Sequence, residues 1–344
     1  MPSSDAANRP RWGGQAGFFE IWFLVAFDPT APRAWWFRYT TFAPAAGQPG
    51  AARATLWAAA FDARGPEPAI AMKHILDAGE YHAGTRERFA IRLGAAELRN
   101  GVCRGEVEGG PHRIAWALRF TPAARAARRV PWLLDHLPLP TRVAHANGEI
   151  ACGGWVSVDG IRHELESAPA VQKHIWGSRR VEELFWLYCP RFDGEVNACL
   201  EATAVRLRRR PGAPRLVPIW LRTAHGVVDR CGLGALAGNR VEVRAPGRLE
   251  FRATSATRSL RAEAWCDPRA LAGYVYRDPA GWDVHVAQSD VASVALELRR
   301  RGHPLAAWGP PRRLTCAEGA ALEFHAPEPL PGVRYLGWDA TGLG

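Results

Sequence analysis

A period-two alternation of apolar and polar residues, broken by short turn dipeptides, constrains the fold of this chain more than any other feature. One clear example is Gly154-Trp-Val-Ser-Val158, followed by Asp159-Gly160 and a second alternating run that starts at Ile161. Successive side chains of a strand point to opposite faces, and Asp-Gly is a strong signal for a two-residue hairpin turn. Similar runs recur along the chain, with turn signals that include Asp28-Pro29, Asn100-Gly101 and Asp193-Gly194. We therefore predict an all-β protein built of sandwiches or barrels.

The length and the aromatic content indicate more than one core. The chain has 344 residues, of which 15 are Trp and 13 are Phe, and it is too long for one small barrel. We place the end of the first domain just after the Gly154–Gly160 hairpin. The predicted organisation is a flexible N-terminus over residues 1–15, an N-terminal β domain over 16–165 and a C-terminal β domain over 166–344.

The segment Ala170-Val-Gln-Lys-His-Ile-Trp-Gly-Ser-Arg180 concentrates the functional signals. His174 and Trp176 stand at i and i+2, so on a strand both side chains point to the same face. Gly177 permits a turn or a close backbone approach, and the aromatic run Leu184–Tyr188 follows. A titratable imidazole beside a π-face suits a pocket for an apolar, polarisable ligand. The alternative is a satisfied core histidine at a barrel end.

The order of elements around this segment resembles a known superfamily. Gly-x-Val-x-Val-x-Gly at 154–160 precedes a short strand at 161–166, then His174-x-Trp176-Gly177 and a Trp-rich strand. This order resembles the middle of the carotenoid 1,2-hydratase and tocopherol cyclase-like superfamily, which also includes lipocalin-like Diels–Alderase enzymes and several bacterial groups. The resemblance is best over residues 150–205 and extends more weakly to 18–24, 35–39 and 283–293. It implies two lipocalin-like (calycin-type) antiparallel barrels or sandwiches packed together.

The resemblance also implies a chemistry. Members that act on isoprenoids protonate or orient a double bond inside an apolar barrel, which requires an acid, π-faces that shield positive charge, and exclusion of water. The motif carries over to His174, Trp176 and Gly177. Hydratase-like members place Tyr-x-Asp on a strand a little under thirty residues after that histidine, whereas this chain has Cys199-x-Glu201. The departure argues against hydration of a carotenoid end group and leaves Glu201 as a candidate acid.

Two further carboxylates are candidates. Glu183 directly precedes the aromatic strand and either faces inward or lies at a solvated strand end. Glu20 is alone in the apolar run Phe18–Trp22, so it must be paired or functional; pairing with Arg38 on the next strand is the simpler option. The alternation places Trp36 and Arg38 on one face of that strand. The expected pocket residues are Trp176, Gly177, Trp186, Tyr188, Trp36, Glu20 and Arg38.

Composition excludes several classes of function. The net charge is +10, but only Lys73 and Lys173 are lysines, and the arginines are dispersed rather than interleaved with exposed aromatics. We therefore expect solvated basic faces and no nucleic-acid partner. No apolar run reaches the length of a membrane span, and residues 1–10 lack the features of a secretory signal, so we expect a cytoplasmic protein without stable membrane insertion.

The cysteines and histidines predict no metal and no cofactor. Seven cysteines are scattered without a Cys-x-x-Cys, and eleven histidines show no metal-ligand spacing. No framed phosphate-binding loop is present either.

The leading prediction is a cofactor-independent enzyme of secondary metabolism, of lyase or isomerase type. It would cyclise, hydrate or isomerise a hydrophobic isoprenoid or polyene-like small molecule in a Trp-rich pocket. His174 would orient the substrate or relay a proton, Glu201 or Glu183 would be the acid, and Trp176 would stabilise cationic character. The main alternative is a non-catalytic carrier of a lipid-like ligand, and a third is a structural protein that associates through exposed aromatics. The oligomeric state is left open.

Overall fold

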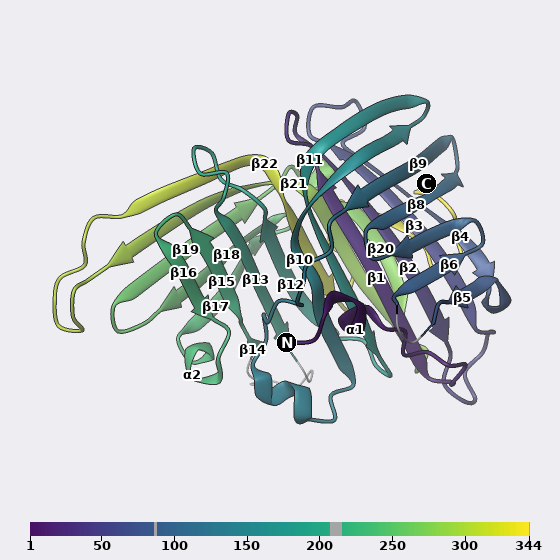
Figure 1. The fold of residues 1–344 in the computed structure, drawn as a ribbon, viewed down its shortest axis with the longest axis horizontal. Helices are drawn as coiled ribbons and strands as arrows, with labels where there is room; N and C mark the ends of the chain where they lie inside the picture. The colour runs from purple at the N-terminus through teal and green to yellow at the C-terminus, as the bar shows by residue number, and fades with distance from the viewer. Residues whose placement is uncertain (86–87, 207–214, 344) are drawn as a thin grey trace.

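The chain folds into two large antiparallel β-sheets that pack together, as the alternation predicted (Figure 1). This computed structural model describes residues 1–85, 88–206 and 215–343. One sheet is nearly closed into a barrel. The all-β, two-sheet fold class is therefore confirmed.

The first sheet contains the N-terminal half of the chain. Most neighbours are consecutive hairpins, but β1 lies between β2 and β11, so the sheet is completed by a strand that comes much later in the sequence. The spatial order is β4 (Ala69–Asp77), β3 (Arg53–Asp62), β2 (Arg33–Ala43), β1 (Phe18–Phe27), β11 (Ile161–Gly177), β10 (Thr141–Val158), β9 (His112–Phe120), β8 (Val102–Gly109), β7 (Ala96–Arg99), β6 (Ala90–Leu93) and β5 (Tyr81–Ala83).

The second sheet follows the same plan. Its centre is formed by β12 beside β22, two strands that lie far apart in sequence. The main order is β16 (Gly226–Arg230), β15 (Ile219–Thr223), β13 (Cys199–Arg206), β12 (Glu183–Cys189), β22 (Arg312–Ala326), β21 (Asp283–Arg300), β19 (Arg258–Trp265), β18 (Arg248–Thr254) and β17 (Asn239–Ala245). Beside this path, β14 (Arg215–Leu216) pairs with β13, β20 (Ala272–Arg277) with β21, and β23 (Arg334–Leu336) with β20.

Helices are short and peripheral. They are α1 (Ser4–Asn8), α2 (Leu233–Leu236) and the 3-10 turns η1 (Ala78–Glu80), η2 (Trp132–His136) and η3 (Pro268–Ala270). None of the helices in the described part of the chain has the length and apolarity needed to cross a membrane.

The chain passes from the first sheet to the second after Gly177. β11 pairs with β1 and β10 up to that residue, so the boundary expected at residue 165 falls inside this strand. The N-terminal residues, expected to be flexible, contain α1, which packs on β10 and β11 and buries Asn8 completely. Hydrogen bonds to buried polar side chains of the first sheet hold this segment in place.

Three large apolar cores stabilise the described part of the molecule. One fills the first sheet around Trp22, Trp35 and Trp116, and another fills the second sheet around Phe251. The third lies between the sheets and gathers aromatic side chains from both, including Trp36, Trp57, Trp186, Tyr188 and Tyr274. Burial of aromatic surface is a major source of stability. The aromatic side chains shared by both sheets therefore hold the two sheets together. The candidate site lies at this junction.

Candidate active site

A cavity of about 230 Å³ opens between the two sheets, and its wall is mostly apolar. The segment around η2 covers one side with Val130, Pro131, Leu134 and Leu139. The strands supply the remaining apolar wall: Phe19, Ile21 and Phe23 from β1, Ile175 and Trp176 from β11, Leu184 and Trp186 from β12, and Val205 from β13. A concave, apolar site with a few polar groups is the usual form of a small-molecule pocket.

A cluster of charged side chains borders this cavity and centres on Glu201. The Lys173 Nζ lies 2.5 Å from Glu201 Oε1, and His145 Nε2 lies 3.2 Å from the same oxygen. The Arg129 Nε donates to Glu201 Oε2 at 3.2 Å, and Trp186 Nε1 lies 3.4 Å from Oε1. Lys173, His145, Arg129 and Trp186 line the cavity, so the carboxylate organises the groups that a ligand would meet.

Strand geometry explains how these side chains come together. Residues of β11 alternate, so Lys173 and Ile175 face the cavity while His174 faces the core of the first sheet. Trp176, near the end of the strand, packs against the His174 ring and also reaches the cavity lining. In β10 the register with β11 shifts between Ala144 and Asn147. Such a bulge re-aims a side chain, and here it accompanies the inward placement of His145.

Burial sets the protonation of the cluster. Burial alone would raise the pKa of Glu201, but Lys173 and His145 outweigh it and hold that pKa well below its ordinary value. Burial lowers the pKa of Lys173, and Glu201 only partly offsets the shift. Burial also lowers the pKa of His145, again against the pull of Glu201. Glu201 is therefore a carboxylate, and Lys173 and His145 are the groups in contact with it whose pKa values burial lowers.

Histidine 174 lies on the opposite face of β11, away from the cavity lining. Its Nδ1 is 2.9 Å from the carbonyl of Ala7, and its Nε2 is 2.7 Å from Glu20 Oε1. Each ring nitrogen thus faces an oxygen, one from the main chain and one from a side chain. The ring stacks on Trp22 with centroids 4.7 Å apart. The arrangement is a fully buried clamp for the N-terminal segment.

Glu20 completes this clamp instead of pairing with Arg38. Its two oxygens accept the main-chain N–H groups of Arg11 and Trp12 at 2.7 and 2.8 Å. Arg38 points to the other face of the first sheet, where its Nε donates to Thr40 Oγ1 and its guanidinium lies 4.0 Å from the centroid of Tyr276. The expected Glu20–Arg38 pair is wrong because period-two alternation places the two side chains on opposite faces.

The other expected pocket residues divide into three groups. Trp176 and Trp186 line the cavity. Trp36 and Tyr188 belong to the core between the sheets, and the Tyr188 hydroxyl donates to the carbonyl of Gly148 at 3.1 Å. Glu183 lies at a half-buried strand end with its carboxylate 2.5 Å from Arg215 Nε.

Gly177 is required by a close approach. A Cβ at this position would lie 2.0 Å from the carbonyl oxygen of Pro140. That oxygen also accepts the N–H of Ser178 at 2.9 Å. The glycine therefore lets the start of β10 lie directly against the end of β11, next to the cavity.

A fully buried carboxyl with a raised pKa lies on β21, at Asp290. Burial raises the pKa of Asp290 from 3.8 to about 8. Both of its oxygens accept from Gln288 Nε2, at 2.9 and 3.0 Å. Asp290 does not line the cavity, so it does not supply the acid expected there from the sequence.

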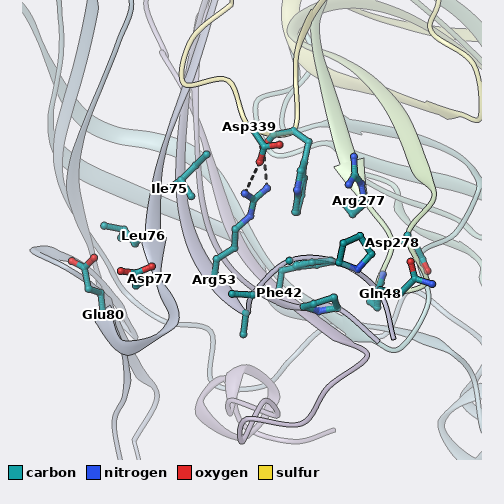
Figure 2. Close-up of a pocket in the computed structure, with 18 residues that line it drawn as sticks. Phe42, Gln48, Arg53, Ile75, Leu76, Asp77, Glu80, Arg277, Asp278 and Asp339 are labelled. Atoms are coloured by element: carbon teal, nitrogen blue, oxygen red, sulfur yellow. Dashed lines mark hydrogen bonds and ion pairs between the residues drawn. The ribbon is translucent and has the colours of Figure 1, made fainter. Parts of the chain in front are cut away.

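A second cleft of about 550 Å³ lies on another part of the surface (Figure 2). Its wall includes Arg53, Arg277 and Asp278, and Arg53 Nη1 donates to Asp339 at 2.8 Å. Arg277 is likewise paired with Asp283. Arg53 and Arg277 are thus already paired, and the smaller cavity, where an apolar wall meets buried groups of shifted proton affinity, is the candidate site.

Among residues 1–85, 88–206 and 215–343, no group of three His, Cys, Asp or Glu side chains is arranged to hold a metal ion.

Sequence reasoning missed Lys173, His145, Arg129 and Arg180. A signal was available for the first: in a chain whose positive charge is almost all arginine, the two lysines are Lys73 and Lys173, and both are buried. Lysine, unlike arginine, shifts its pKa readily when buried. No comparable signal marked the histidine and the two arginines.

Comparison with solved structures identifies proteins of similar fold. Kievitone hydratase from Nectria haematococca has a TM-score of 0.54 at 8% identity, over 93% of this chain and 91% of that chain. CghA bound to Sch210972 has a TM-score of 0.51 at 9% identity, over 95% and 93% of the two chains.

In sequence, the chain is similar to Rv0493c of Mycobacterium tuberculosis, described as uncharacterized, with 26% identity over 224 residues. That match covers 62% of this chain and 60% of the relative, so the chain spans less than two thirds of the length of the curated relatives it matches. No family model matches the sequence. The chain therefore shares the two-sheet β fold of kievitone hydratase and CghA.

Proposed function

We propose that this protein is an enzyme that performs acid–base chemistry on an apolar small molecule held between its two sheets. One observation carries the proposal: Lys173 and His145, both buried, border an apolar cavity and share the Glu201 carboxylate. Ion pairs that serve stability alone are commonly exposed, whereas buried groups with shifted pKa values in a cavity are typical of active sites.

The geometry assigns a role to each group. Glu201 accepts from Nε2 of His145 and so favours the tautomer whose Nδ1 carries a lone pair. With its pKa lowered by burial, the imidazole is neutral near pH 7 and can remove a proton from a ligand. Glu201 is a positioning residue in this scheme.

Lys173 supplies the complementary charge. Its ammonium lies 4.1 Å from the centroid of Trp186 and faces the cavity together with Arg129. A cation in this position stabilises negative charge on a carbonyl oxygen when the adjacent C–H loses its proton. The C–H electron pair moves into the enolate. When the enolate takes up a proton at another carbon, the result is isomerisation. When it instead expels a β-hydroxyl, which takes up a proton as it leaves, the result is loss of water.

The reaction class is therefore that of a lyase or isomerase, and the reverse of water loss is hydration. An isoprenoid or polyene-like substrate, as the sequence resemblance implies, fits the apolar wall. The cavity is below the usual 300–1,000 Å³ of a ligand pocket. We therefore propose a small substrate, or one that inserts only its reactive end.

The second candidate function is a carrier, favoured by the largely apolar wall and by the cover formed by Val130, Pro131 and Leu134. Such a cavity can hold a ligand without any chemistry. The carrier retains its ligand unchanged, so the two functions differ in one measurable outcome.

The test is incubation of the purified protein with an extract of apolar metabolites, followed by liquid chromatography with mass spectrometry. The wild type is expected to deplete one compound and to form a product of equal mass or one that differs by a water. Lys173→Met and His145→Gln are expected to bind that compound without converting it. His136→Gln, an exposed histidine on η2, is the matched control. Binding without conversion by every form would establish the carrier, and turnover that survives in Lys173→Met would exclude the proposed chemistry.

A further inference from the structure

Arg180 places a buried guanidinium at the cavity, in the connection that follows β11. Its main-chain N–H donates to Asp278 Oδ2 at 2.5 Å, and its Nε donates to the carbonyl of Arg277 at 2.8 Å. The residue is 7% exposed and lines the cavity. These contacts hold the Nε side of the guanidinium, and no described residue accepts a hydrogen bond from either Nη group.

This guanidinium has no carboxylate partner within 4 Å among the described residues. The Asp278 carboxylate accepts instead from the main-chain N–H groups of Arg180 and Ala280. The Arg180 guanidinium lies instead over Phe19 and Tyr276, at 4.4 and 5.2 Å from the ring centroids. A buried charge is costly unless it is paired, and burial lowers the pKa of Arg180 to about 9.

The surroundings add positive charge. Arg38, 2% exposed, lies over the same Tyr276 ring at 4.0 Å, and its Nη2 has no hydrogen-bond partner in the described residues. The nearby carboxylate, Glu323, is already paired with His325. Arg180 therefore lines the cavity with a second buried guanidinium, that of Arg38, behind it across the Tyr276 ring, and no described carboxylate lies within 4 Å of Arg180.

We propose that the natural ligand carries a single carboxylate, which binds the Nη groups of Arg180, while its apolar body lies against Phe19, Trp176 and Leu184. A guanidinium offers two parallel N–H donors that match a carboxylate. One accessible guanidinium suits a monoanion better than a phosphate dianion. The substrate class is thus an apolar carboxylic acid. Binding of its carboxylate at Arg180 does not depend on the proposed function, whereas its conversion at Lys173 rests on that function.

Isothermal titration with 1-naphthoate and its neutral counterpart 1-naphthamide tests this site, because the two probes differ only in the anionic group. The wild type is expected to bind the acid ~10- to 100-fold more tightly than the amide, as for a hydrogen-bonded charge pair. Arg180→Gln is expected to lose that preference and to keep its affinity for the amide. Arg180→Lys, which retains a cation, is expected to keep part of the preference and guards against a folding defect.

Two controls separate this inference from the proposed function. Arg179→Gln removes the adjacent exposed arginine, which pairs with Glu182, and is expected to keep the full preference. Lys173→Met is expected to lose turnover and to keep the preference. If the preference depends on Arg180 but no compound is converted, the subsite stands and the enzyme proposal fails. Failure of the wild type to bind naphthoate, a preference that survives in Arg180→Gln, or its loss only in Lys173→Met would overturn the subsite.

Discussion

Asp290 offers the sharpest test of the physical account of the interface between the sheets. The side chain is completely buried, and burial raises its pKa from 3.8 to about 8. The folded protein thus holds a proton that the unfolded chain releases near pH 4. Stability is therefore fully present below pH 4 and falls as the pH rises toward 8.

The magnitude follows from the two pKa values. A displacement of roughly four pH units corresponds to about 6 kcal/mol, lost at about 1.4 kcal/mol per pH unit. Between pH 5 and 7.5 the wild type should therefore lose ~3 kcal/mol relative to a variant that cannot titrate at this position. Asp290→Asn is that variant, and it fits the site because the buried Gln288 Oε1 has no partner in the described residues and can accept from an amide.

Urea unfolding at closely spaced pH values measures the effect. The free energy of unfolding of Asp290→Asn minus that of the wild type should grow with pH over this range, since other titrating groups cancel in the difference. Asp77→Asn, at an exposed carboxylate, should give a curve parallel to that of the wild type. Parallel curves for Asp290→Asn and the wild type would refute the reasoning, because they would require a counter-charge or solvent access at Asp290.

Two other substitutions test the residues around β11. Gly177→Ala should lower the free energy of unfolding by ~2 kcal/mol or more, since the new Cβ overlaps the Pro140 carbonyl; Gly302→Ala, where a Cβ meets open space, should be nearly neutral, and equal effects of the two would contradict the close approach. Glu20→Gln replaces an acceptor of main-chain N–H groups and should release the N-terminal segment at a cost of ~1–3 kcal/mol. Hydrogen exchange should rise in residues 4–12, and unchanged protection there would rule out the clamp.

Local features of the fold were predictable because they depend on neighbouring residues. The turn at Asp159-Gly160 has positive φ at both residues, 50° and 83°, as a type I′ hairpin turn requires. Alternation also placed Trp36 and Arg38 correctly on one face of their strand, toward the core between the sheets.

Long-range register was not predictable from these patterns. Glu201 lies 72 residues from Arg129, and the two meet only because β13 and the segment before β10 border the same junction. The pairing of β1 with β11 brings His174 beside Trp22 and Glu20. A period-two pattern states which residues share a face, but it contains no information about which distant strand lies opposite. The sequence therefore singled out the strand that borders the cavity and did not identify which of its faces does so.

The two faces of β11 act together because adjacent residues of a strand cannot move independently. His174 fixes the strand from the first core through Ala7 and Glu20, and Lys173 extends from the same backbone to Glu201 in the cavity. A shift of the strand that loosened the clamp would also change the 2.5 Å contact between Lys173 and Glu201. Catalytic groups must be held to within about half an ångström. The buried histidine, although it does not line the cavity, therefore supports the chemistry we propose by holding the strand that carries Lys173.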